Sequence, residues 1–187
     1  MRVPKEHCLA LSLATALAVL SLSAPGAAAE QVPWGAGCMP TPAGATRTSA
    51  NCGASLSGGV ATAPPGAPSA VKRAIAAANR LRGRPYVWGG GHASFLSRGY
   101  DCSGAVGYVL HATGLLDRTM VSGELAYWGE AGLGRWITVY ANSEHVFMVI
   151  AGLRFDTRDD PPGVSGPRWK RARVDARRFA ARHPLGL

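Results

Sequence analysis

The sequence has no hydrophobic run long enough to span a membrane. The main apolar run covers residues 9–22 of the 187-residue chain, whereas a membrane-spanning helix needs about 20 apolar residues. Arg2 and Lys5 precede this run, small residues ending at Ala29 follow it, and no stop-transfer pattern comes after. This order is typical of a secretory signal peptide cut after Ala29. We therefore expect a secreted, extracytoplasmic protein without a transmembrane segment in the mature chain.

Cysteine is scarce, with four in the whole chain. Cys8 lies ahead of the apolar run, which excludes a lipoprotein signal, and it is lost with the signal peptide. Because exported compartments favour disulfides, Cys38 and Cys52, which are close in sequence, are expected to pair with each other. Cys102 is then left unpaired. It is either a buried structural thiol, which packs like a small apolar residue, or a reactive one.

Other patterns are absent as well. The sequence shows no internal repeat, no nucleic-acid-binding motif and no spacing of histidine, cysteine and carboxylate residues typical of a metal site. We therefore expect no metal, no other cofactor and no nucleic-acid partner.

Acidic residues are few, 11 against 20 lysines and arginines, which gives a net charge of +9. Much of the excess lies in "RWKRARVDARRFAARHPLGL", residues 168–187. A basic exported protein is attracted to anionic wall polymers and lipid head groups. A solvated basic face explains the composition equally well.

Composition divides the rest of the chain at Ser69. Residues 30–68 are small, polar and rich in proline and glycine, which predicts a flexible linker with at most one disulfide loop. A short docking element held by Trp34 is the alternative. Residues 69–187 are long enough for one domain with a core. They begin with apolar residues at helical spacing, and Gly83 ends this pattern.

The predicted elements of residues 69–187 run from helices to strands. A second apolar helical pattern starts near Cys102 and stops at Gly114. Three strand-like runs follow at residues 135–141, 145–151 and 153–157, and the last two are separated by so few residues that they predict an antiparallel hairpin. Helices first and strands second indicate an α+β fold rather than alternating β/α units.

Cys102 stands at the start of the second helix, within "GYDCSGAV". Asp101 and Ser103 flank it, so its surroundings are more polar than those of a packing residue. The unsatisfied N–H groups and the dipole of a helix N-terminus favour an anion. The position therefore suits a thiolate nucleophile.

A thiolate nucleophile needs a base, and the mature chain offers four histidines. His111 lies nine residues after Cys102, about 13 Å along the same helix, too far to exchange a proton. His183 belongs to the C-terminal tail and His92 to a loop. His145 opens a predicted strand, where a sheet would hold its ring against the helix terminus, so it is the candidate base.

Four segments together resemble the NlpC-type cell-wall cysteine peptidases of bacteria, a papain-like group. They are "RPYVWGGG", "YDCSGAVGYVLHATGLL", "DRT" and "HVFMVI", in that order, and the resemblance covers about residues 69–157. It implies a papain-like α+β domain in which the nucleophile lies at a helix N-terminus that packs on an antiparallel sheet.

The resemblance also assigns roles. It implies that Cys102 is the nucleophile and His145 the base, that Tyr86 lies beside the nucleophile, and that Asp101 and Ser103 hold the end of the substrate peptide. A polar residue of the next strand orients the imidazole in this family. That strand reads "LRFDT", so the third catalytic residue is Asp156, with Thr157 as the alternative.

The sequence departs from the family pattern in three places. The loop between Gly89 and Asp101 is longer than expected, Glu144 replaces the usual glycine before the histidine, and Phe147 stands where a small residue is common. These changes bear on the choice of substrate more than on the chemistry.

The function implied is hydrolysis of peptidoglycan stem peptides, most often at the bond between D-glutamate and the diamino acid. Two other functions stay open. One is a muramoyl-alanine amidase or an acyltransferase on the same scaffold, and the other is a cell-wall-binding module without catalysis. The sequence does not indicate an oligomeric state.

Overall fold

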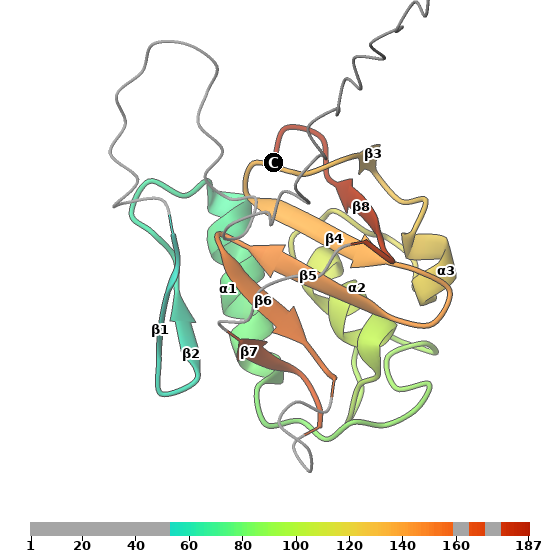
Figure 1. Ribbon diagram of the computed structural model, residues 1–187. Helices are drawn as coiled ribbons and strands as arrows, with labels where there is room; N and C mark the ends of the chain where they lie inside the picture. The colour runs from blue at the N-terminus through green and yellow to red at the C-terminus, as the bar shows by residue number, and fades with distance from the viewer. Residues whose placement is uncertain (1–52, 159–164, 171–176) are drawn as a thin grey trace, which may run out of the picture. The chain divides into compact units, whose positions relative to one another are not determined.

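The computed structural model describes residues 53–158, 165–170 and 177–187 (Figure 1). The predicted signal peptide, the Cys38–Cys52 pair and most of the predicted linker lie outside these residues. The helices are α1 Ser69–Leu81, α2 Cys102–Ala112 and α3 Ser122–Leu125, and the strands are β1 Ser55–Ser57, β2 Val60–Thr62, β3 Glu130–Ala131, β4 Ile137–Ala141, β5 Val146–Ile150, β6 Leu153–Asp156, β7 Arg168–Lys170 and β8 Ala180–His183. No helix in the described ranges has the length and apolar content needed to cross a bilayer.

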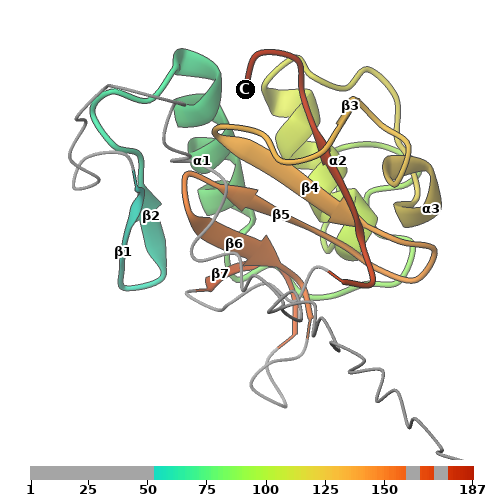
Figure 2. The same ribbon diagram turned by 45° about the horizontal axis from the view of Figure 1, so that its top comes forward.

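The predicted α+β class is confirmed. Within the described residues, an antiparallel sheet of six strands runs in the order β3-β8-β4-β5-β6-β7. The two longer helices, α1 and α2, lie together on one face of this sheet (Figures 1 and 2). The three strand-like runs of the sequence become β4, β5 and β6.

The central strand β5 is buried along its whole length. Met148 and Ile150 belong to the core cluster that includes the helices, whereas Phe147 and Val149 belong to a second cluster with Tyr140. Since successive side chains of a strand point to opposite faces, β5 contributes to both clusters in turn. Burial on two faces explains why its sequence is continuously apolar rather than alternating.

Helix α1 follows the apolar spacing of its sequence. Val71, Ile75 and Leu81 are among the side chains that it buries, and Gly83 follows the helix with φ of 80°, the left-handed conformation that glycine adopts readily. No side chain caps the start of α1. Ser69 is the first helical residue, and Pro68 before it makes no side-chain capping bond.

Helix α2 is held at its N-terminus by a close backbone contact. Gly104 lies against Gly90 of the loop between Gly89 and Asp101, named here the glycine-rich loop. A Cβ atom at Gly104 would be 1.9 Å from the Gly90 carbonyl oxygen. Only glycine fits at this distance. The loop before the helix is therefore fixed directly on the first turn of α2, which carries Cys102.

Residues 55–62, inside the segment predicted as a linker, form the antiparallel hairpin β1–β2. The Asn79 side chain of α1 accepts from the Ala61 N–H at 3.0 Å and donates to the Ala61 carbonyl at 2.8 Å. Ala61 is itself buried in the core. The last part of this segment thus packs on the domain, although its composition resembles that of a linker.

The elements α3, β3, β7 and β8 have no counterpart among the elements predicted from the sequence. These elements have two to four residues each, too few to show a period. Strand β8 reads "AARH" within the basic tail, and Arg182 donates to the carbonyl groups of Tyr127, Trp128 and Gly129. Partners more than 50 residues away in sequence, rather than local propensity, hold this strand in the sheet.

Candidate active site

Cys102 is the first residue of α2 and is partly exposed. It is a free thiol. The Asp101 carboxylate caps the helix by accepting from the Gly104 N–H at 2.8 Å. Helix α2 packs on β5 with Val106, Val109 and Leu110 buried, so the packing of the helix fixes where the sulfur lies.

His145 lies in the turn between β4 and β5, one residue before β5 begins. The Asn142 side chain shapes this turn by accepting from the Glu144 and His145 N–H groups at 2.9 and 2.8 Å. The His145 carbonyl accepts from the Asn142 N–H at 3.0 Å. This turn sets the backbone position of the histidine, and the ring then meets groups from two other elements.

The His145 ring is placed between Asp156 and Cys102. Its Nε2 lies 2.9 Å from Oδ1 of Asp156, and its side chain lies near Cys102. Burial lowers the pKa of His145, but the hydrogen bond to Asp156, the neighbouring Cys102 and the negative charges of both raise it to about 9. The ring is therefore mostly protonated at neutral pH and forms an imidazolium beside the sulfur.

Asp156 ends β6 and is 2 % exposed. Besides His145, its carboxylate accepts from the Arg154 guanidinium and from the Arg158 N–H, the latter at 3.1 Å. Burial raises the pKa of Asp156, but these donors and the charges of Arg154 and His145 hold it below its usual range. Asp156 is thus an ionised, oriented partner for the imidazole.

Thr157, the alternative third residue, does not reach the histidine. Its hydroxyl oxygen is buried and has no hydrogen-bond partner among the described residues. Of the two candidates, the structure brings Asp156 to His145.

Aromatic rings border the histidine. The ring centroids of Phe147 and Phe179 lie 6.1 and 6.4 Å from that of His145, and the two phenylalanines pack edge to face at 5.1 Å. Phe147 stands where the family resemblance predicts a small residue. Its ring also stacks under the Arg154 guanidinium, 3.9 Å from the centroid. These rings reduce the access of water to the buried side of the histidine and aspartate.

Tyr86 lies close to the sulfur. Burial and the negative charges of Cys102 and Asp101 raise the pKa of Tyr86. Its backbone forms a bridge with Tyr100, two residues before Cys102. The hydroxyl group is therefore protonated at neutral pH and is available as a donor beside the thiol.

Asp101 and Ser103 are both buried, at 4 % and 3 % exposure. The Asp101 carboxylate accepts from the N–H groups of Gly89 and Gly104 and from the Ser103 hydroxyl, at 2.8 to 3.1 Å. It thereby joins the glycine-rich loop to α2. The substrate-holding role implied for these two residues stays a prediction.

His92, predicted only as a loop residue, lies against Asp101 and Ser103. Its Nε2 lies 2.9 Å from both Oδ2 of Asp101 and the Ser103 hydroxyl. The His92 side chain is 35 % exposed, so it presents one ring edge to solvent beside the two buried residues. No sequence signal marks this position, since the contact depends on how the loop folds back.

Metal-binding side chains form no cluster among the described residues. The described ranges contain no cluster of three or more histidine, cysteine or acidic side chains able to bind a metal ion.

Comparisons with known proteins find similar structures only. No protein-family model and no curated protein matches the chain. Among solved structures, the peptidoglycan hydrolase RipB of Mycobacterium tuberculosis is 24 % identical, with a TM-score of 0.47 over 60 % of this chain and 64 % of that one. A hypothetical invasion protein of the same organism is 24 % identical, with a TM-score of 0.45 over 60 % and 61 %.

A mutated form of the Resuscitation Promoting Factor Interacting protein RipA is 23 % identical, with a TM-score of 0.46 over 61 % of this chain and 62 % of that one. The chain thus spans less than two thirds of each of these structures. The similarity concerns the fold alone.

Proposed function

We propose that this protein is a cysteine peptidase that hydrolyses peptidoglycan stem peptides outside the cytoplasm. The observation that carries the proposal is the position of His145, which lies beside Cys102 and hydrogen-bonds to the buried Asp156. In such an arrangement the thiol is the nucleophile, the imidazole is the general base, and the carboxylate orients the imidazole.

The first half of the reaction forms a thioester. The Cys102 thiolate attacks the carbonyl carbon of an amide, so that a C–S bond forms and the carbonyl oxygen becomes an oxyanion. N–H groups at the start of α2 and the Tyr86 hydroxyl are the candidate donors to this oxyanion. The His145 imidazolium then gives its proton to the leaving nitrogen, and the C–N bond breaks.

The second half releases the product. His145, now neutral, accepts a proton from water, and the resulting hydroxide attacks the thioester carbonyl. The C–S bond breaks, the new carboxylic acid leaves, and the thiolate and imidazolium are restored. Asp156 stays ionised throughout and stabilises the imidazolium.

The choice of peptidoglycan rests on the sequence resemblance to NlpC-type peptidases and on the basic charge of an exported chain. We propose the bond between D-glutamate and the diamino acid as the one that is cut. Exposed Trp88 and Tyr127, at 86 % and 84 %, offer aromatic surface to a polymeric substrate.

Digestion of purified peptidoglycan tests the proposal. The chain without residues 1–29 is compared with its Cys102→Ala and His145→Ala variants, and the soluble fragments are identified by mass spectrometry. We expect stem peptides cut at the named bond from the wild type and none from either variant, with unchanged circular dichroism spectra. Release by the Cys102→Ala variant at the wild-type rate would contradict the nucleophile assignment.

The same experiment separates the other functions. Fragments cut between muramic acid and L-alanine would identify an amidase, and products joined to an added amine would identify an acyltransferase. Equal binding to peptidoglycan by all three proteins without release of fragments would identify a wall-binding module.

A further inference from the structure

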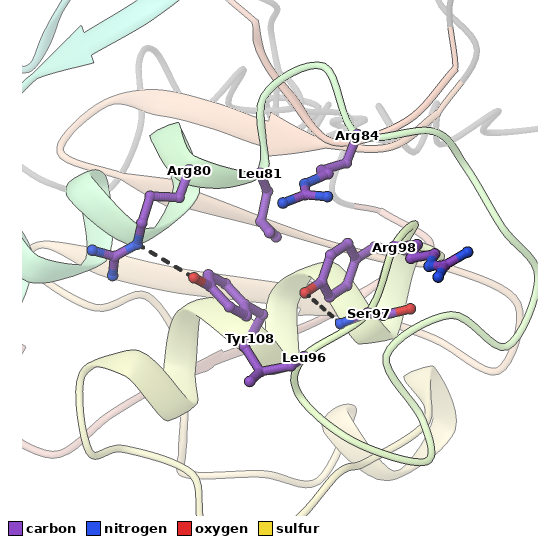
Figure 3. A pocket seen from close by; sticks show the side chains of 8 residues that line it. Arg80, Leu81, Arg84, Leu96, Ser97, Arg98 and Tyr108 are labelled. Carbon is purple, nitrogen blue, oxygen red and sulfur yellow. Dashed lines mark hydrogen bonds between the residues drawn. The ribbon is translucent and has the colours of Figure 1, made fainter.

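A hollow of about 570 Å³ lies between the end of α1, the loop before α2 and the middle of α2, and none of Cys102, His145 and Asp156 lines it (Figure 3). Three arginines and no acidic residue line it. The lining residues are Arg80, Leu81, Arg84, Leu96, Ser97, Arg98, Tyr100 and Tyr108. This set, which we name the arginine pocket, shares no side chain with the proposed catalytic site.

The positive groups of the arginine pocket have few partners in the protein. Arg80 donates through Nε to the Tyr108 hydroxyl at 3.3 Å, which leaves the outer nitrogens of its guanidinium open. Arg84 and Arg98 form no ion pair or hydrogen bond with any other described side chain. In Figure 3 the Arg84 guanidinium points toward Leu81, while the Arg98 side chain points away from Leu81.

The floor of the arginine pocket is rigid and partly apolar. The Tyr100 hydroxyl donates to the Phe95 carbonyl at 2.9 Å and accepts from the Ser97 N–H at 3.0 Å, which fixes the loop that forms one wall. Leu96 is 79 % exposed and lies near Tyr108 in Figure 3. An exposed leucine beside a tyrosine ring offers an apolar surface next to the positive charges.

We propose that the arginine pocket binds a phosphate group carried on a sugar. A guanidinium presents a planar fork of donors that matches the oxygens of a phosphate, and two forks can share one phosphate group. A carboxylate has two oxygens and is satisfied by a single fork. The Tyr108 and Leu96 side chains beside the guanidinium groups provide an apolar surface on which the C–H face of a sugar ring can pack.

This binding site has a consequence for the whole protein. A phosphorylated sugar held at the arginine pocket contacts none of the side chains of the proposed catalytic site, so we infer that it acts as an anchor rather than as a substrate. The inference is independent of the proposed peptidase activity, because none of its residues takes part in that chemistry.

Nuclear magnetic resonance titration tests the inference. The ¹⁵N-labelled chain without residues 1–29 is titrated at low ionic strength with N-acetylglucosamine 1-phosphate. Separate titrations use inorganic phosphate, N-acetylglucosamine and glucuronic acid. We expect saturable shifts of the Arg84, Ser97 and Tyr108 amides with the sugar phosphate, and affinities at least about tenfold lower for the three other probes. Added salt is expected to weaken the binding, because the charges are exposed.

A matched set of variants locates the site. Arg80→Gln combined with Arg84→Gln is expected to lower the affinity about tenfold or more, whereas Arg73→Gln, which removes an exposed charge from the same helix outside the pocket, leaves it unchanged. The spectra of the free variants report whether each is folded.

Four results would overturn the inference. Shifts that do not saturate, or an equal loss of affinity in the Arg73→Gln variant, would mean that no site exists. Equal affinity for glucuronic acid would exclude selection of phosphate, and equal affinity for inorganic phosphate would exclude a contribution from the sugar.

Discussion

Arg154 donates a hydrogen bond to Oδ2 of Asp156, two residues further along β6, while Oδ1 of the same carboxylate faces His145. The Arg154 side chain is 14 % exposed and lies over the Phe147 ring. The arginine is therefore a positioning residue for Asp156. It holds the carboxylate ionised and turned toward the imidazole.

Replacing Arg154 by glutamine is expected to reduce kcat about tenfold and to change KM little, since about 1.4 kcal/mol of transition-state stabilisation would be lost with the orientation of Asp156. The loss of a positive neighbour also raises the pKa of Asp156. The acid limb of the pH–rate profile should therefore move to higher pH. Steady-state kinetics on stem peptides over a pH series measure both effects.

Arg73→Gln serves as the control, because Arg73 is an exposed residue of α1. Arg154→Lys should restore part of the activity by returning the charge. If Arg154→Gln lowers the melting temperature but leaves kcat and the acid limb unchanged, the arginine has only a structural role.

Asp156→Asn keeps the shape of the side chain but removes its charge and one acceptor. We expect kcat to fall by roughly 10²- to 10⁴-fold, because the imidazolium loses its stabilising partner. The pKa of His145, about 9 in the native protein, should fall, since the bond to Asp156 and its charge both raise it. Proton chemical shifts of the imidazole followed over pH measure this change.

Thr157→Val provides the contrasting variant. The Thr157 hydroxyl oxygen is buried without a hydrogen-bond partner in the described part of the chain, and valine has nearly the same shape. Activity should be unchanged and the free energy of unfolding equal or slightly higher. A large loss of kcat in this variant with an active Asp156→Asn protein would transfer the orienting role to Thr157.

The dependence of stability on pH follows from His145. Its pKa is about 9 in the folded protein and about 6.5 when it is unfolded. The protonated ring therefore contributes stability that is fully present below about pH 6.5 and is lost as pH rises through about 9. Denaturant unfolding at a series of pH values should show this fall in the wild type and a smaller one in His145→Gln.

The proposed reaction should lose rate over the same alkaline range, since in it the imidazolium supplies the proton to the leaving amine.

Asp156 affects stability at acid pH. Because its pKa is lowered in the folded protein, its contribution to stability is present above about pH 4 and is lost as pH falls. A stability curve that stays flat between pH 6.5 and 9 would contradict the His145–Asp156 pairing.

Two glycines of α2 make a matched pair for testing how the loop holds the helix. A Cβ at Gly104 would meet the Gly90 carbonyl at 1.9 Å, whereas at Gly107 the nearest atom, in the Phe95 ring, is 3.7 Å away. Gly104→Ala should lower the free energy of unfolding by about 3 kcal/mol or more through this backbone clash. Gly107→Ala should be neutral or stabilising by about 0.5–1 kcal/mol, because alanine favours a helix. Urea unfolding measures both, and equal effects would mean that the loop does not rest on Gly104.

Local sequence patterns were sufficient to predict the position of α1, the start of α2 and the strands β4, β5 and β6. The spacing of Val71, Ile75 and Leu81 predicted α1, and the apolar runs predicted β4, β5 and β6. The polar pair around Cys102 placed that residue at the start of a helix. In each case the signal lies within about a dozen neighbouring residues, and burial of one helix face or of a whole strand is enough to produce it.

The sequence by itself therefore determined the class of the fold, the helix terminus that carries Cys102 and the strand that follows His145. Only the tertiary structure decided that His92 meets Asp101 and Ser103, that Asp156 rather than Thr157 reaches His145, and which three arginines share a hollow. It also joined Trp169 of β7 to Asn79 of α1, 90 residues apart, through a hydrogen bond of 2.8 Å. Such contacts depend on how the chain folds back on itself. Residues that are distant in sequence produce no periodic pattern from which their contact could be predicted.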